Sequence, residues 1–218
     1  MNRPPRSRVW DISPTVSPSA PVFPGDEPFS LEWTARLGPG CPVNLSAVRF
    51  SPHVGAHADA PLHYANDGAS IDAVGLAPYL GPCRVIHALD CGALIDIAHL
   101  QHAAENLPPR VLVRTRHRAL TAWSDQFAAF APATVDWLAA QGVTLIGLDT
   151  PSVDPATSKT LDSHASLRRH ALRVLENLVL DDVPEGDYEL IALPLKLQGA
   201  CASPVRAVLR ALPPTLCP

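Results

Sequence analysis

The chain has 218 residues, of which 47% are hydrophobic and 17% are charged, and this composition excludes disordered, collagenous and coiled-coil proteins. The length predicts one domain over residues 1–218 with a sizeable core, and residues 1–7 are expected to form a flexible tail. The formal net charge is −4 and no block of Lys and Arg is long, so neither nucleic acid nor a membrane surface is an expected partner.

The start of the chain is basic but does not read as a secretory signal. Residues 1–8 lead into Val9-Trp10-Asp11 instead of an apolar stretch, and no run of about 18 apolar residues occurs elsewhere. The five cysteines are odd in number and lack C-x-x-C spacing, which indicates reduced thiols. We therefore expect a cytoplasmic protein without a membrane span.

Prolines punctuate the first part of the chain. Of the 24 prolines, 11 lie within residues 1–61, where they separate short runs of alternating polar and apolar residues. Two such runs, 29–36 and 43–50, are predicted strands between rigid turns.

From Pro82 onward, short apolar runs alternate with stretches of helical periodicity. The predicted strands are 83–89, 111–114, 144–148 and 190–193, the predicted helices are 97–107, 134–140 and 166–179, and 203–212 fits either type. This alternation predicts an α/β fold.

Four side chains able to bind a metal or transfer a proton fall within eleven residues: His53, His57, Asp59 and His63. Their separations are all even, so an extended chain would direct them to one face, whereas a helix would spread them and would have to contain a proline. A straight strand would put the first and last about 33 Å apart. The chain must therefore fold back, and Gly55 and Pro61 are the positions that permit it.

Two imidazoles and a carboxylate, with His57 and Asp59 as the closest pair, suit Zn²⁺ or a similar divalent ion. Such a site leaves a position for water, whose pKa the metal lowers, and this is hydrolytic chemistry. The alternative is a set of independently satisfied polar residues at a strand edge. We favour the metal site because burying several ionisable groups together is costly unless something pairs them.

A second pair is His164 and Glu176. Glu176 borders the apolar stripe of the predicted 166–179 helix, so it needs a partner, and an arginine such as Arg168 or Arg173 is one alternative. Asp162 or Ser163 could cap this helix, which would leave His164 near its first turn and about 18 Å from Glu176 along a continuous helix. If both residues serve one site, His164 must lie on a loop that returns toward Glu176. The remaining histidines are expected to be structural: His87, His99, His102, His117 and His170.

Taken together, these motifs resemble the bacterial-type kynurenine formamidases (arylformamidases), within the cyclase-like metallohydrolases. The most specific motif is the H-x-G-x-H-x-D-x-P-x-H string of residues 53–63. Supporting motifs occupy 10–14, 21–26, 149–154, 164–176, 194–197 and 203–206, so the resemblance covers nearly the whole chain. It implies a swivelling β/β/α fold, in which a mixed sheet or barrel core is flanked by a few helices.

The resemblance also implies a pair of divalent ions, usually zinc, and a homodimer. One ion would be held by His53, His57 and Asp59, and the other by Asp59, His164 and Glu176. His63 would donate and accept the proton, and the aromatic ring of Phe23 would lie against the substrate's ring. Two positions depart from the family: Phe23 replaces the usual Trp, and Cys201 stands where an acidic residue is expected.

The implied reaction is hydrolysis of the small molecule N-formyl-L-kynurenine to L-kynurenine and formate, a step of tryptophan breakdown. A related hydrolase that opens a cyclic amide such as isatin would carry the same 53–63 string, and residues 21–26 and 194–206 favour the formamidase. A non-catalytic metal-binding domain is the alternative from another class. A serine hydrolase is not expected because the sequence contains no G-x-S-x-G string.

Overall fold

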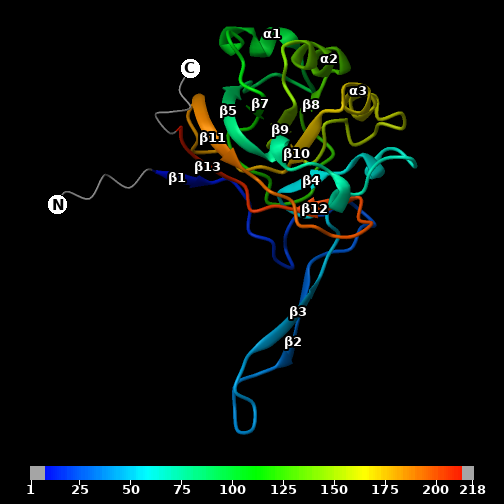
Figure 1. Cartoon of the computed structure of the whole chain (residues 1–218), viewed down its shortest axis with the longest axis vertical. Helices are drawn as coiled ribbons and strands as arrows, with labels where there is room; N and C mark the ends of the chain where they lie inside the picture. The colour runs from blue at the N-terminus through cyan, green and yellow to red at the C-terminus, as the bar shows by residue number, and fades with distance from the viewer. Residues whose placement is uncertain (1–7, 213–218) are drawn as a thin grey trace, which may run out of the picture.

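A computed structural model describes residues 8–212 of the chain, which build a curled mixed sheet with three helices (Figure 1). The nine strands of that sheet are β1 (Val9–Asp11), β13 (Val208–Ala211), β11 (Gly186–Ile191), β5 (Leu80–His87), β7 (Arg110–Arg114), β9 (Leu145–Leu148), β10 (Arg173–Glu176), β4 (His57–Asp59) and β12 (Ala202–Pro204), in spatial order. The predicted fold class is confirmed.

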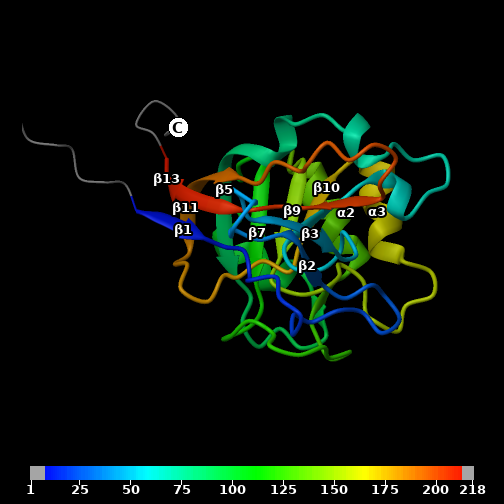
Figure 2. The same cartoon turned by 90° about the horizontal axis from the view of Figure 1, so that it is seen from below.

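The centre of the sheet is parallel and its two ends are antiparallel. Strands β5, β7, β9 and β10 run parallel to one another. Every other pairing in the sheet is antiparallel, including β5 with β11 and β10 with β4. Figures 1 and 2 show β1 beside β13, so the first and last strands within residues 8–212 are neighbours.

The three helices, α1 (Ile97–Leu100), α2 (Pro132–Ala140) and α3 (Asp162–His170), pack on one face of the sheet. Successive residues of a strand point to opposite faces, so Val111, Val113 and Ile146 pack under the helices while Leu112 and Leu145 belong to the other core. Loop residues complete that second core. Both faces of the parallel strands are thus buried, as expected for such a sheet.

A hairpin of β2 (Ser30–Ala35) and β3 (Leu45–Arg49) extends away from the body (Figure 1). Both predicted strands of this region are confirmed. A second small sheet pairs β6 (Leu94–Ile95) with β8 (Ala129–Phe130), and short 3-10 turns occupy Pro61–His63, Ile71–Ala73, Ala77–Tyr79 and Gln101–Ala103.

The predicted 166–179 helix is wrong in its C-terminal half. Helix α3 ends at His170, Ala171 adopts a left-handed conformation with φ of 54°, and the chain continues as strand β10. The 97–107 helix is also wrong beyond Ala103, since only α1 and one 3-10 turn form there. Residues 203–212 supply strands β12 and β13 and no helix.

Within residues 8–212, no helix has the length and apolar character needed to cross a membrane. The predicted flexible tail, residues 1–7, lies outside the described residues.

Candidate metal centre

Strands β4 and β10 bring three of the proposed ligands to one face of the sheet. Their antiparallel register pairs Glu176 with His57 and Val174 with Asp59. Because Ala58 of β4 packs in the core on the opposite side from the helices, the alternation of a strand directs His57 and Asp59 toward the helical face. All three polar side chains are buried, so they need partners there.

Two turns fold the flanking histidines back onto this strand, as the sequence predicted. Gly55 has φ of +74°, and a Cβ at this position would lie 2.6 Å from a methyl of Val16. The 3-10 turn that begins at Pro61 returns His63 to within 3.9 Å of an Asp59 carboxylate oxygen, and Nδ1 of His53 lies 3.1 Å from the other oxygen. Gly55 is therefore needed both for the turn and for close packing.

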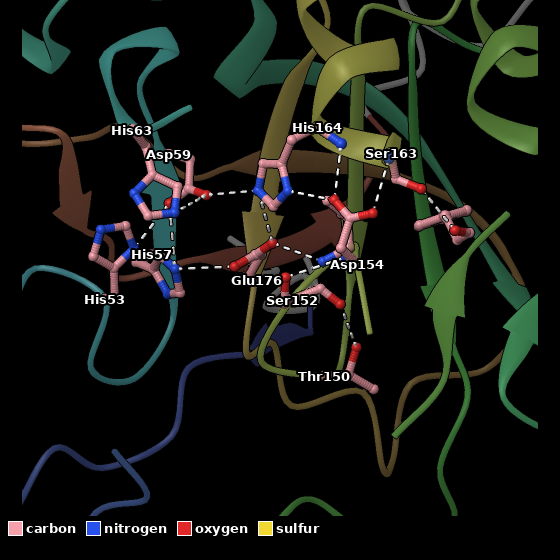
Figure 3. Close-up of polar contacts among 12 residues, drawn as sticks. His53, His57, Asp59, His63, Thr150, Ser152, Asp154, Ser163, His164 and Glu176 are labelled. Carbon is pink, nitrogen blue, oxygen red and sulfur yellow. Dashed lines mark hydrogen bonds and ion pairs between the residues drawn. The ribbon is translucent and has the colours of Figure 1, made fainter. Parts of the chain in front are cut away.

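His164 lies in the first turn of α3, as predicted, whereas the loop expected for a site shared with Glu176 is wrong. Its Nε2 is 3.4 Å from Asp59 Oδ2 and 3.9 Å from Glu176 Oε1, while Glu176 Oε2 is 3.2 Å from His57 Nε2. The two residues meet because α3 is short and β10 returns under it. Figure 3 shows Glu176 between His57 and His164.

The arginines weighed as partners of Glu176 point elsewhere. Arg168 pairs with Asp67, and Arg173 donates a weak hydrogen bond, 3.5 Å long, to the carbonyl of Leu172. Glu176 Oε1 instead accepts the backbone N–H of Val153 at 2.9 Å. The alternative in which this carboxylate is neutralised by an arginine is therefore wrong.

Asp154 orients His164, a role that the sequence analysis missed. Its carboxylate lies 2.6 Å from His164 Nδ1 and accepts the backbone N–H groups of Ser163 and His164 at 2.9 and 3.0 Å. A carboxylate on one ring nitrogen fixes the imidazole so that the other nitrogen is presented for coordination. Asp154 belongs to the 149–154 motif, but no local pattern distinguishes its role.

Buried carboxylates set the charges of the cluster. Burial opposes charge on His57, but Glu176 and Asp59 outweigh it and raise the pKa of His57 to about 9. Burial likewise opposes charge on His164, yet Asp154 and Asp59 raise its pKa to about 10. For Asp59, burial alone would raise the pKa, and hydrogen bonding to His164 holds it well below its usual range. Hydrogen bonding to His164 also lowers the pKa of Asp154 against the effect of burial, so Asp59 and Asp154 are anionic although they are buried.

The donor set fits a cation. His57 Nε2 and Asp59 Oδ1 face each other at 3.4 Å, but within residues 8–212 both atoms are buried and lack a hydrogen-bond partner. Ligand atoms within 4.8 Å of one another form three groups among the described residues: His53, His57 and Asp59; Asp59, His63 and His164; and His53, His63 and Cys201. Glu176 belongs to none of them. The first two groups share Asp59, and an ion among their atoms would satisfy the orphaned nitrogen and oxygen.

A cleft of about 320 Å³ opens beside the cluster and has an aromatic wall. Phe23 is 53% exposed in it, and its ring packs edge-on against Trp123 with centroids 5.2 Å apart. Phe127 lines the same cleft. Trp123 was not predicted from the sequence, because it is 100 residues away from Phe23 and no motif around it indicates a binding site.

Cys201 lies beside this cluster, whereas the histidines predicted to be structural lie outside it. Cys201 Sγ is 3.5 Å from His53 Nε2, so the residue that departs from the family contacts a proposed ligand. The histidines expected to be structural bond elsewhere; His87 reaches the carbonyl of Val183, and His170 pairs with Asp136.

Comparisons with known proteins agree with this arrangement. A family model described as putative cyclase matches residues 10–155. The kynurenine formamidase of Bordetella pertussis is 68% identical over 206 residues, which cover 94% of this chain and 99% of that protein. This chain belongs to the kynurenine formamidases of the cyclase family. The kynurenine formamidase of Delftia acidovorans is 67% identical over 205 residues, covering 94% of this chain and 98% of that protein.

Solved structures share the fold of this formamidase family member. A potential metal-dependent hydrolase with cyclase activity superimposes with a TM-score of 0.82 at 26% identity, over 95% of this chain and 99% of that one. Isatin hydrolase A from Labrenzia aggregata gives a TM-score of 0.80 at 23% identity, over 94% of each chain. The second likeness concerns the fold alone.

Proposed function

We propose that this protein is a metal-dependent arylformamidase that hydrolyses N-formyl-L-kynurenine to L-kynurenine and formate. The observation that carries the proposal is a buried cluster of histidines and carboxylates that opens on an aromatic cleft. A formanilide group has the matching shape, with a flat ring beside the amide to be cleaved. The high identity to kynurenine formamidases supports the same substrate.

The imidazoles and carboxylates of the cluster are proposed to bind two zinc ions. His53, His57 and Asp59 would hold one ion, and Asp59, His164 and Glu176 would hold the other, with Asp59 between them. Imidazole and carboxylate are ligands that zinc accepts in catalytic sites. When bound, the ions would supply Lewis-acid polarisation of the formyl carbonyl and an activated water.

His63 is proposed to move the proton. Its side chain is 34% exposed, compared with 20% for His53 and 2% or less for His57 and His164, so it is the histidine most open to a substrate. It lines the cleft. Imidazole titrates near neutrality, so His63 Nε2 can accept a proton during attack and return it to the departing anilinic nitrogen.

The test is ultraviolet-monitored hydrolysis of N-formyl-L-kynurenine by the purified protein, before chelation, after chelation and after zinc is returned. Activity should disappear with the metal and return with it. Isatin serves as the comparison substrate, because an enzyme that opens cyclic amides would prefer it. If the metal-replete protein cleaves isatin and leaves N-formyl-L-kynurenine untouched, the substrate assignment is wrong. Metal binding without turnover of either substrate would favour the non-catalytic alternative.

We also propose that residues 1–218 form one domain of a cytoplasmic homodimer. The hairpin of β2 and β3 supports a dimer, because it leaves the body and exposes large apolar side chains, including Leu31, Trp33 and Val48. Exposed apolar patches of this kind mark protein interfaces.

A further inference from the structure

Among residues 8–212, the cleft is lined by two charged residues besides the histidines and Glu176, and these are Lys159 and Asp26. Neither belongs to the proposed ligand set. They have opposite signs, and N-formyl-L-kynurenine carries an ammonium and a carboxylate on the chain that extends from its ring. The cleft thus offers one counter-charge for each of these groups.

Asp26 is held in the cleft by the same turn that presents the aromatic ring of Phe23. The backbone N–H of Asp26 donates to the carbonyl of Phe23 at 2.9 Å, and Gly25 between them has φ of +94°, a conformation that favours glycine. One tight turn therefore places a ring and a carboxylate in the same cleft. A substrate ring held by Phe23 would bring its side chain close to Asp26.

Lys159 lies on the loop that joins Asp154 to α3. The loop is braced internally, since the N–H of Ser158 donates to the carbonyl of Pro155 and the N–H of Leu161 donates to Ser158 Oγ. Within residues 8–212, the Lys159 ammonium has no carboxylate as an ion-pair partner, and its side chain is exposed at the cleft. It can therefore reach an anionic group of a ligand without breaking an existing ion pair.

We propose that Lys159 and Asp26 select the amino-acid group of the substrate, with Lys159 binding its α-carboxylate and Asp26 its α-ammonium. This inference rests on the proposed formamidase function and adds the residues that determine specificity. Neither residue takes part in the proposed chemistry. Hydrogen bonds between charged groups are stronger than neutral ones, so each contact contributes both affinity and discrimination.

Three substrates that differ in their charged groups test the Lys159 contact and the Asp26 contact separately. N-formyl-L-kynurenine has both charged groups, N-formylkynuramine lacks the carboxylate, and formanilide lacks both. Lys159→Ala should lower kcat/KM for N-formyl-L-kynurenine about 10-fold and leave kcat/KM for N-formylkynuramine and formanilide unchanged. Asp26→Asn should lower kcat/KM for N-formyl-L-kynurenine and N-formylkynuramine, which both carry the ammonium group, and leave kcat/KM for formanilide unchanged. Lys196→Ala, which removes the chain's other lysine, is the matched control and should change nothing.

Equal losses on all three substrates in Lys159→Ala, or no loss at all, would overturn the assignment of Lys159. Equilibrium binding of L-kynurenine and of kynuramine to the metal-loaded protein gives a reading that needs no turnover. Wild type should prefer L-kynurenine, and Lys159→Ala should lose that preference. If wild type does not hydrolyse N-formyl-L-kynurenine, the proposed function is wrong, while this binding comparison still decides whether Lys159 recognises the carboxylate.

Discussion

Asp59 is the residue on which the cluster depends most. Its two oxygens lie within 4 Å of four imidazole rings, at 3.1 Å from His53, 3.4 Å from His57, 3.4 Å from His164 and 3.9 Å from His63. The side chain is fully buried, so its charge is stabilised only by these neighbours and by any ion among them.

Variants of Asp59 and His63 should therefore fail in different ways. Asp59→Ala should lose bound metal and activity, and Glu176→Ala should do the same. His63→Ala should keep its metal and lose turnover, because a positioned general acid and base contributes roughly 100-fold or more. Metal analysis of each purified protein beside its rate checks this. Full metal content in both carboxylate variants would show that the ligand assignment is wrong.

Asp154→Ala should weaken metal binding although Asp154 is not a proposed ligand. The change removes the partner of His164 Nδ1 and leaves two backbone N–H groups unsatisfied, and losses of roughly 10- to 100-fold in metal affinity are typical of such contacts. Competition with a metal chelator measures the affinity. Asp162→Asn, at an exposed position of the same helix, is the control, and an equal loss there would contradict a specific role for Asp154.

The site could be predicted where its residues are close in sequence. The 53–63 string predicts a metal site because four donors occur at even spacing around a glycine and a proline. His164 and Glu176 could be paired only through a family resemblance, since their contact depends on where a helix ends. Asp154 and Trp123 were missed because their roles depend on contacts with residues far along the chain or on a neighbouring loop.

At the scale of elements, the misread segment is the one after α3. Leu172, Leu175 and Leu178 repeat every third residue, which is typical of a helix, but they divide between the two cores: Leu172 packs on the helical face and the other two on the opposite face. Val174 and Leu175 of β10 are both buried although they point to opposite faces of the sheet. A short apolar run of this kind cannot be distinguished from part of a buried helix by periodicity alone. Residues 173–176 form a strand because they pair with β9 on one side and β4 on the other. These pairings exist only in the folded chain.

The end of α3 gives a stability prediction. Ala171 has φ of 54°, and a residue with a Cβ is strained in this conformation. Ala171→Gly should therefore raise the free energy of unfolding by about 1 kcal/mol. Ala165→Gly, at an exposed position inside the same helix, should lower it by about 1 kcal/mol. Urea unfolding of both variants measures the difference, and a shift of the same sign in both would contradict the strain argument.

At the scale of the molecule, the β2 and β3 hairpin provides the test of the dimer. Leu31 and Val48 are register partners with 46% and 56% of their surfaces exposed. The double variant Leu31→Ser and Val48→Ser should shift the protein from dimer to monomer in analytical ultracentrifugation, because the apolar area that drives association is lost. Leu76→Ser, at an apolar residue exposed elsewhere, should leave the mass unchanged. A wild-type protein that sediments as a monomer would refute the dimer itself.

The order of the strands also has a consequence for biosynthesis. Strand β4 is bordered by β10 and β12, and β1 is bordered by β13. A ribosome that has made the first half of the chain has produced His53, His57 and Asp59 but neither strand that borders them. Because distant pairings form only after the intervening chain exists, the centre is completed when synthesis is nearly finished. The proposed ligand set can therefore be complete only after strand β10, which carries Glu176, has been synthesised.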